Sequence, residues 1–186
     1  LDMKKRFYIV RHGEKVKRIG NPPLSGRGIL QAKATGKYLR VFPIQKVIAS
    51  PILRTRQTAQ HIAHNLSLDV LTRELLKERV NWGDDPNQTF EEFLKMWERA
   101  SINREWIPPV GDSSRVAGER LQKIINSQNG EENHIALVTH GGIITDFLRN
   151  IFDEITLDSA FKGFNKSREE SILECSITTV DFDFQN

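Results

Sequence analysis

Residues 7–14 read Phe7-Tyr8-Ile9-Val10-Arg11-His12-Gly13-Glu14 and join a short apolar run to a charged segment. Four consecutive apolar residues of this kind predict a buried strand of a parallel sheet. In α/β proteins, ligands bind outside the carboxyl ends of such strands, where Arg11, His12 and Gly13 would stand. The stretch therefore predicts an α/β fold with a guanidinium and an imidazole at its functional edge.

Two later segments repeat this transition from an apolar strand to a polar turn. Residues 47–49 lead into residues 50–59 (SPILRTRQTA), and residues 135–138 lead into residues 139–142 (THGG). Because parallel strands bring their carboxyl ends to one edge of a sheet, we expect the charged side chains at these ends to converge. These side chains are Arg11, His12, Arg54 and His140.

Apolar residues at helical spacing follow each of these strands, within residues 29–39, 59–66 and 144–151. Strands that alternate with helices predict a mostly parallel sheet with helices on both faces, which is a three-layer α/β/α fold. Residues 89–92 have the capping-box pattern and predict a further helix, whose aromatic face we expect to lie in the core. This face comprises Phe90, Phe93, Leu94 and Trp97. Residues 112–113 predict the start of another helix.

Taken in order, four motifs resemble those of the histidine phosphatase superfamily, in branch 1 of the phosphoglycerate mutase-like proteins. The motifs are residues 11–14, 50–59, 139–142 and 173–178, and together they span nearly the whole chain. The resemblance implies a phosphoglycerate mutase-like fold in which residues 173–178 form the last strand. It also implies that Cys175 packs within that strand.

The same resemblance implies roles for the site residues. The implied catalytic residues are His12, as nucleophile, and His140, and the implied substrate-binding residues are Arg11, Arg54, Gly13 and Gly141. Elementary chemistry agrees, because a transferring phosphoryl group spreads negative charge over three oxygens, which two arginines can stabilise. A neutral imidazole is a competent nucleophile, and neighbouring arginines disfavour its protonation.

A leaving alkoxide needs a proton, which a carboxylic acid can donate before it takes a proton from the incoming water. Glu78 is our candidate for this third catalytic residue. Other carboxylates lie nearby in the sequence, namely Glu14, Glu74, Asp84 and Asp85. Arg56 similarly competes with Arg54 for the role of phosphate-binding arginine.

Members of this family often carry an asparagine that touches the phosphate soon after the first motif. Here residues 15–20 intervene, and Asn21 is the candidate for that contact. A chain of 186 residues leaves little room for the insertions with which mutases of this family enclose a phosphosugar. We therefore expect hydrolysis of a small phosphate monoester through a phosphohistidine. The alternatives are a phosphoglycerate mutase-type phosphotransferase and a regulatory phospholigand-binding protein.

Length and composition predict a single domain over residues 1–186, with a lid-like insertion at about residues 76–112. The formal net charge of +3, from 27 basic and 24 acidic residues, suits a small anionic substrate but is too small to indicate nucleic acid. No apolar run approaches a membrane span, and the single Cys175 allows no intrachain disulfide, so we expect a cytoplasmic protein. We expect neither a cofactor nor a metal ion, and the oligomeric state stays open.

Overall fold

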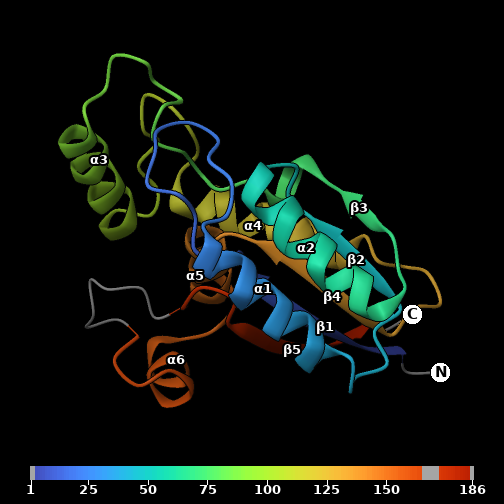
Figure 1. Ribbon diagram of the computed structural model, residues 1–186. Coiled ribbons are helices and arrows are strands. Elements are labelled where there is room, and N and C mark those ends of the chain that lie inside the picture. Colours follow the sequence, from blue (N-terminus) through green and yellow to red (C-terminus); the bar gives the residue numbers. More distant parts are fainter. Residues whose placement is uncertain (1–2, 165–171, 185–186) are drawn as a thin grey trace.

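The computed structural model describes residues 3–164 and 172–184 and confirms the mixed α/β fold with a mostly parallel sheet (Figure 1). The strands are β1 (Met3–Arg11), β2 (Lys46–Ala49), β3 (Val70–Thr72), β4 (His134–Thr139) and β5 (Ile177–Phe184). The helices are α1 (Gly26–Leu39), α2 (Leu53–Leu66), the 3-10 turn η1 (Glu74–Leu76), α3 (Phe90–Ile102), α4 (Ser114–Asn126), α5 (Gly141–Ile151) and α6 (Glu154–Ala160). The elements β3, η1 and α6 come in addition to the predicted ones.

The strands form one sheet in the order β3-β2-β4-β1-β5. Strands β1 to β4 run parallel to one another, and β5 pairs antiparallel with β1. Because β1 and β4 are direct neighbours, their carboxyl ends lie side by side, with Arg11 paired to Thr139. The two histidine motifs that follow these strands therefore start from adjacent points.

The last strand begins later than predicted. Strand β5 starts at Ile177, and Cys175 lies before it in a turn with a φ of 57°. The backbone N–H of Cys175 donates to the carbonyl oxygen of Arg11 at 3.0 Å, and its own carbonyl oxygen accepts from the Thr35 hydroxyl at 3.2 Å. The prediction that Cys175 packs within the strand is therefore wrong, because this residue closes a turn against the end of β1. Burial raises the pKa of its thiol to about 11.

Apolar side chains alternate between the two faces of the central strands and build two cores. Phe7 and Ile9 of β1 belong to the core that α4 and α5 cover, whereas Tyr8 and Val10 belong to the core that α1 and α2 cover. Figure 1 shows these two helix pairs on opposite faces of the sheet. The result is the predicted three-layer fold.

Helix α3 does not bury its aromatic face in either core. The capping box of residues 89–92 forms as predicted, with both of its reciprocal hydrogen bonds. The buried residues of the helix are Met96 and Ala100, whereas Phe90 is 50% exposed and Leu94 is 48% exposed. Helix α3 stands beyond the end of the sheet in Figure 1, so the expectation of a core face is wrong.

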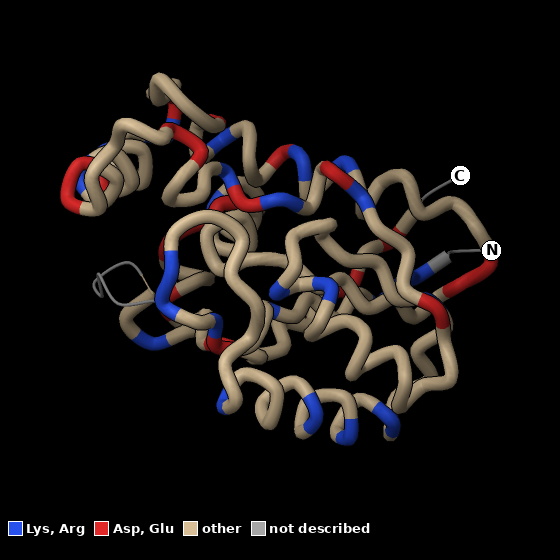
Figure 2. The backbone as a smooth tube through the Cα atoms, turned by 45° about the horizontal axis from the view of Figure 1, so that its top comes forward, with Lys and Arg blue, Asp and Glu red and all other residues tan. Residues whose placement is uncertain are grey.

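Charged residues of both signs are spread over the molecule (Figure 2). The charged residues of helix α1, namely Arg27, Lys33 and Lys37, are all basic. Only a distant ion pair, of 3.8 Å, joins Arg27 to Glu14. The small excess of positive charge in the chain is thus carried in part by this helix.

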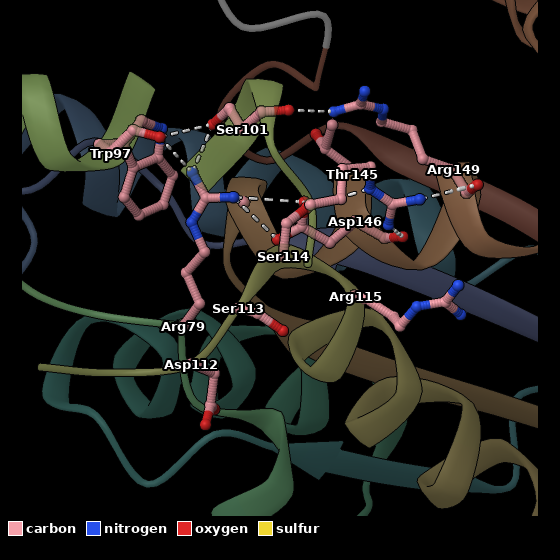
Figure 3. A network of polar contacts seen from close by, with 12 residues as sticks. Arg79, Trp97, Ser101, Asp112, Ser113, Ser114, Arg115, Thr145, Asp146 and Arg149 are labelled. Carbon is pink, nitrogen blue, oxygen red and sulfur yellow. Dashed lines mark hydrogen bonds and ion pairs between the residues drawn. The ribbon is translucent and has the colours of Figure 1, made fainter. Parts of the chain in front are cut away.

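A buried arginine links α3 to α4 and α5 (Figure 3). Nη1 of Arg79 donates to the two carboxylate oxygens of Asp146 in α5 at 3.3 and 3.2 Å, and Nη2 donates to the carbonyl oxygen of Trp97 in α3 at 3.0 Å. The guanidinium also lies 3.8 Å from the centre of the Trp97 ring. Ser114, the first residue of α4, donates to the same carboxylate. Arg79 therefore fixes the position of its neighbour Glu78 relative to α5.

We expect Arg79→Met to destabilise the fold strongly, because it leaves the buried carboxylate of Asp146 without its ionic partner. Removal of one partner of a buried pair costs about 3–5 kcal/mol. Burial raises the pKa of Asp146 to about 6, and Arg79 opposes that rise, so the substitution should raise this pKa further. The loss of unfolding free energy should therefore be largest near about pH 8 and shrink toward pH 6, where the carboxylate takes up a proton.

Urea denaturation at both pH values measures this effect. Arg115→Met is the matched control, because Arg115 forms an exposed ion pair with Glu105, and exposed pairs contribute little. A loss for Arg79→Met that equals that of the control, or that does not change with pH, would contradict this account.

Candidate active site

Four of the predicted residues meet at the carboxyl end of the sheet. His12 follows β1, His140 follows β4 and is the N-cap of α5, and Arg54 lies in the first turn of α2, which follows β2. Arg11 is the last residue of β1, and all four side chains are buried. The strand order accounts for this convergence, because β4 pairs with both β1 and β2.

The imidazole of His12 presents an unprotonated nitrogen to Arg54. Its Nδ1 donates to the carbonyl oxygen of Gly13 at 2.7 Å, and its Nε2 accepts from Nε of Arg54 at 3.1 Å. Burial and then the charge of Arg54 hold the pKa of His12 well below its usual range, although the Gly13 carbonyl opposes this shift. The ring is therefore neutral near pH 7 and carries a lone pair on Nε2.

His140 lies behind Arg54 and does not itself line the pocket. Its Nδ1 accepts from Nη2 of Arg54 at 3.2 Å, and its Nε2 donates to the hydroxyl of Ser50 at 2.9 Å. The ring packs edge-on against that of His12, with 5.3 Å between the ring centres. Burial, followed by the charge of Arg54, holds the pKa of His140 well below its usual range. Two neutral imidazoles thus flank one guanidinium.

Arg54 is the centre of this arrangement, and Arg56 has no part in it. Nη2 of Arg54 also donates to Oδ1 of Asn81 at 2.7 Å, so the guanidinium contacts both histidines and the segment after η1. Arg56 is exposed and does not line the pocket. One turn after Arg54, the Thr58 hydroxyl accepts from the backbone N–H of Gly13 at 3.1 Å and ties α2 to the first motif.

Arg11 is held by the segment that precedes β5. Its Nη1 donates to the carbonyl oxygen of Ile172 at 2.8 Å, and its Nη2 lies 3.9 Å from the carboxylate of Glu174. A Cβ added to Gly141 would lie 3.3 Å from Cδ and Nε of Arg11. The glycine at this position therefore leaves room for the arginine side chain.

Glu78 faces the N-terminus of α5. Its carboxylate accepts from the backbone N–H of Gly142 at 2.9 Å and from that of Arg79 at 3.0 Å. A Cβ added to Gly142 would lie 2.6 Å from both Oε1 of Glu78 and Cη2 of Trp97, so close packing here requires glycine. Glu78 lines the same pocket as His12. The competing carboxylates that do not line it are Glu14, Glu74, Asp84 and Asp85.

Gly13 serves the packing of the first motif rather than the pocket wall. A Cβ added to Gly13 would lie 2.6 Å from the carbonyl oxygen of Gly28, and one added to Gly28 would lie 2.0 Å from that of Glu14. The carboxylate of Glu14 accepts from the Ser25 hydroxyl at 2.6 Å. Glu14 thus braces the loop against the start of α1, and Gly13 contributes the carbonyl oxygen that orients His12.

The structure places Asn21 outside the pocket lining. Its Oδ1 accepts from the backbone N–H of Leu53 at 3.0 Å, at the first residue of α2. The asparagine that contacts Arg54 and lines the pocket is Asn81. Sequence reasoning missed Asn81 because its position depends on the path of the chain after η1. The signal in the sequence that could have indicated Asn81 is its position three residues after the candidate Glu78.

The pocket has a volume of about 310 Å³ and three kinds of wall. Its floor holds Arg11, His12, Arg54 and Glu78. The loop after β1 adds the basic residues Lys15 and Arg18, whereas Lys17 does not line the pocket. The apolar wall consists of Val80, Trp82, Phe90, Phe93, Leu94 and Trp97. The size suits a small molecule that combines a charged group with an apolar one.

Within residues 3–164 and 172–184, no three His, Cys, Asp or Glu side chains are grouped so that they could hold a metal ion. The helices of these same segments are all too short or too polar to cross a membrane.

Comparison with known proteins assigns the chain to a family. Residues 7–183 match the family model of the histidine phosphatase superfamily (branch 1). The chain is 30% identical over 151 residues to an uncharacterized phosphatase, PhoE, of Bacillus subtilis (strain 168), with 77% of this chain and 75% of that protein covered. It is also 26% identical over 191 residues to a probable phosphoglycerate mutase, GpmB, of Yersinia pestis (strain Pestoides F). This match covers 95% of this chain and 85% of that protein.

The fold is also similar to a solved structure of phosphoglycerate mutase from Bacillus anthracis str. Sterne. The TM-score is 0.70 at 17% sequence identity, and the match covers 97% of this chain and 89% of that one. This likeness concerns the fold, whereas the match of the family model runs from β1 into β5 and includes both histidine motifs. The chain therefore belongs to branch 1 of the histidine phosphatase superfamily.

Proposed function

We propose that this protein is a phosphomonoesterase that hydrolyses a small phosphate ester through a phosphohistidine on His12. The proposal is carried by the neutral His12 ring, whose Nε2 lies 3.1 Å from Nε of Arg54 in a pocket floor that also holds Arg11. A lone pair next to two cations is what attack on an anionic phosphoryl group requires. The Bacillus subtilis relative, which is named as a phosphatase, supports the same reaction.

In the first step, Nε2 of His12 attacks phosphorus while the ester P–O bond breaks. Arg11 and Arg54 stabilise the negative charge on the three equatorial oxygens, and His140 orients Arg54 from behind it. Glu78 in its protonated form donates the proton to the leaving oxygen. The leaving group departs as a neutral alcohol, and the phosphoryl group stays bound to Nε2.

Two backbone features assist this step. Gly141 lines the pocket at the N-terminus of α5, and the first N–H groups of a helix attract anions. The carbonyl oxygen of Gly13 accepts the Nδ1 proton of His12 and so leaves Nε2 as the unprotonated nitrogen.

In the second step, water cleaves the P–N bond. Glu78, now a carboxylate, takes a proton from the water as its oxygen attacks phosphorus. The electron pair of the broken bond returns to Nε2, inorganic phosphate is released, and Glu78 is again protonated. Each group has then returned to its initial state.

The proposal includes no metal or cofactor, because two arginines supply the positive charge that divalent ions supply in other phosphotransferases. Its only partner is a small phosphate ester, without nucleic acid or membrane. We also propose that the lid-like segment at about residues 76–112 covers the site, and that the chain acts as one domain in the cytoplasm. The single Cys175 suits a reducing compartment.

A phosphoglycerate mutase-type phosphotransferase is the second candidate, favoured by the relatives named as probable phosphoglycerate mutases. It would share the first step and differ in the acceptor of the phosphoryl group. Steady release of inorganic phosphate without a primer supports the phosphatase, whereas turnover that requires a bisphosphorylated primer supports the mutase. A purely regulatory phospholigand-binding protein would have no use for a neutral His12 in the same pocket as Glu78.

We expect His12→Ala to abolish turnover and covalent labelling together. A radiolabelled phosphate ester, mixed with the protein in EDTA and quenched, should leave an acid-labile, base-stable label on the wild type, as phosphoramidates do. His64→Ala, which removes an exposed histidine of α2, should be labelled like the wild type. An acid-stable label on a serine or an aspartate would exclude this mechanism.

We expect Arg54→Ala to lower kcat/KM by tenfold or more, since a charge-assisted hydrogen bond contributes about 1.5–3 kcal/mol. It should also move the acidic limb of the pH profile upward, because Arg54 is one of the groups that hold the pKa of His12 low. Arg56→Ala is the control from the same helix. If Arg56→Ala has the larger effect, the phosphate-binding arginine has been assigned wrongly.

We expect Glu78→Gln to be selective for the leaving group. General acid catalysis contributes about 10²–10⁴-fold, so this loss should appear with alkyl phosphates, which expel a strongly basic alkoxide. A nitrophenyl ester needs little protonation and should lose much less, unless dephosphorylation becomes limiting, which a burst would reveal. Glu74→Gln, at a side chain that is 73% exposed, is the control. Equal losses on both esters would remove Glu78 from the role of acid.

A further inference from the structure

We propose that the site selects phosphate monoesters whose alcohol carries an apolar, aromatic body, and that this body lies along α3. The inference rests on the proposed phosphatase function, because it assumes that the phosphoryl group occupies the pocket floor. It concerns the apolar wall of the pocket, which the chemical steps do not use.

Four aromatic rings form a continuous row along this wall. The ring centres are 4.8 Å apart for Trp82 and Phe90, 6.3 Å for Phe90 and Phe93, and 6.0 Å for Phe93 and Trp97. Phe90 is 50% exposed, and the neighbouring Leu94 is 48% exposed. Large apolar side chains gathered at a concave surface, rather than in the core, are typical of a site that binds an apolar group.

The row begins next to the reacting atoms. A Cβ on Gly142 would lie 2.6 Å from both Cη2 of Trp97 and Oε1 of Glu78, so the ring and the carboxylate converge on the same point of α5. Glu78 is the group that protonates the leaving oxygen in the proposed mechanism. The body of the alcohol, which is bonded to that oxygen, therefore starts beside Trp97 and continues toward Phe93 and Phe90.

The inner end of the row is held rigidly. The guanidinium of Arg79 lies 3.8 Å from the centre of the Trp97 ring and is itself fixed by the buried carboxylate of Asp146 at 3.2 Å (Figure 3). A surface that is already ordered loses little conformational entropy when a ligand binds to it. The Trp97 end of the wall is therefore already ordered before an apolar ligand binds.

The charged side chains that line the pocket come from outside the aromatic row. The cations of the pocket lie in its floor and in the loop after β1, where Lys15 and Arg18 are. The pocket-lining residues between positions 80 and 97 are aromatic or aliphatic except for Asn81. The Asn81 side chain contacts Arg54. A compact anion such as a phosphoglycerate would leave the aromatic row unused, whereas an aromatic alcohol would bury apolar surface against it.

The test compares 3-phenylpropyl phosphate with n-propyl phosphate on the full chain. The two alcohols have nearly the same basicity, so a difference in rate reports on the ring and not on the leaving group. We expect kcat/KM to be about 10–100-fold higher for the phenylpropyl ester, mainly through KM, as burial of a side-chain-sized apolar group predicts. We expect 3-phosphoglycerate to be no better than the propyl ester.

Substitutions on α3 locate the effect. Phe90→Ala and Leu94→Ala should each lower kcat/KM about 3–10-fold more for the phenylpropyl ester than for the propyl ester. Ile102→Ala is the matched control, because Ile102 is a 76% exposed apolar residue of the same helix that does not line the pocket. It should change neither rate.

Calorimetry with phenylpropylphosphonate and propylphosphonate separates this inference from the proposed function. If propyl phosphate is hydrolysed in a His12-dependent way but the ring improves neither turnover nor binding, the apolar site is excluded and the phosphatase stands. If no monoester is hydrolysed but the phenylpropyl compound binds more tightly in a Phe90-dependent way, the apolar site stands and the phosphatase fails.

Discussion

The site depends on one guanidinium that is held between two buried imidazoles. Arg54 donates to Nε2 of His12 and to Nδ1 of His140, so protonation of either ring would place a second positive charge against the first. Burial, and after it the charge of Arg54, keeps both histidines neutral, and the lone pair of His12 remains usable. Arg11 adds further positive charge to the same floor. An anionic phosphoryl group would relieve the repulsion among these cations, so the pocket is most stable electrostatically when it is filled.

The fold maintains this arrangement through strand order and one buried ion pair. The carboxyl ends of β1 and β4 lie side by side, which brings two histidines 128 positions apart in the sequence to within 5.3 Å between ring centres. Arg79 and Asp146 then join the segment of Glu78 to α5, whose N-terminus follows His140. His140 and Glu78 are therefore both joined to the N-terminal part of α5.

The residues that the sequence predicted well belong to local patterns, and those it missed depend on distant contacts. His12, Arg54 and His140 each follow an apolar run that ends in a polar turn, a signal contained in a few residues. The start of β5 depends instead on a left-handed turn at Cys175, which strand propensity does not report. The amphipathic pattern of α3 likewise identifies an apolar face, but it cannot say whether protein or a ligand covers that face. Asn81 contacts Arg54 only because of the path taken by the loop after η1.

The aromatic wall also bears on the choice between hydrolysis and phosphoryl exchange. Both proposed reactions would pass through a phosphohistidine on the same residue, so the motifs around His12 and His140 do not distinguish them. A primed mutase must pass its phosphoryl group to a second hydroxyl of the bound monoester and hold the bisphosphorylated compound until the other phosphoryl group returns to the histidine. An alcohol whose body is aromatic and apolar offers no such hydroxyl along the row from Trp97 to Trp82. Once such a product leaves, water is the acceptor that reaches the pocket, and the substrate class inferred from α3 therefore favours the phosphatase.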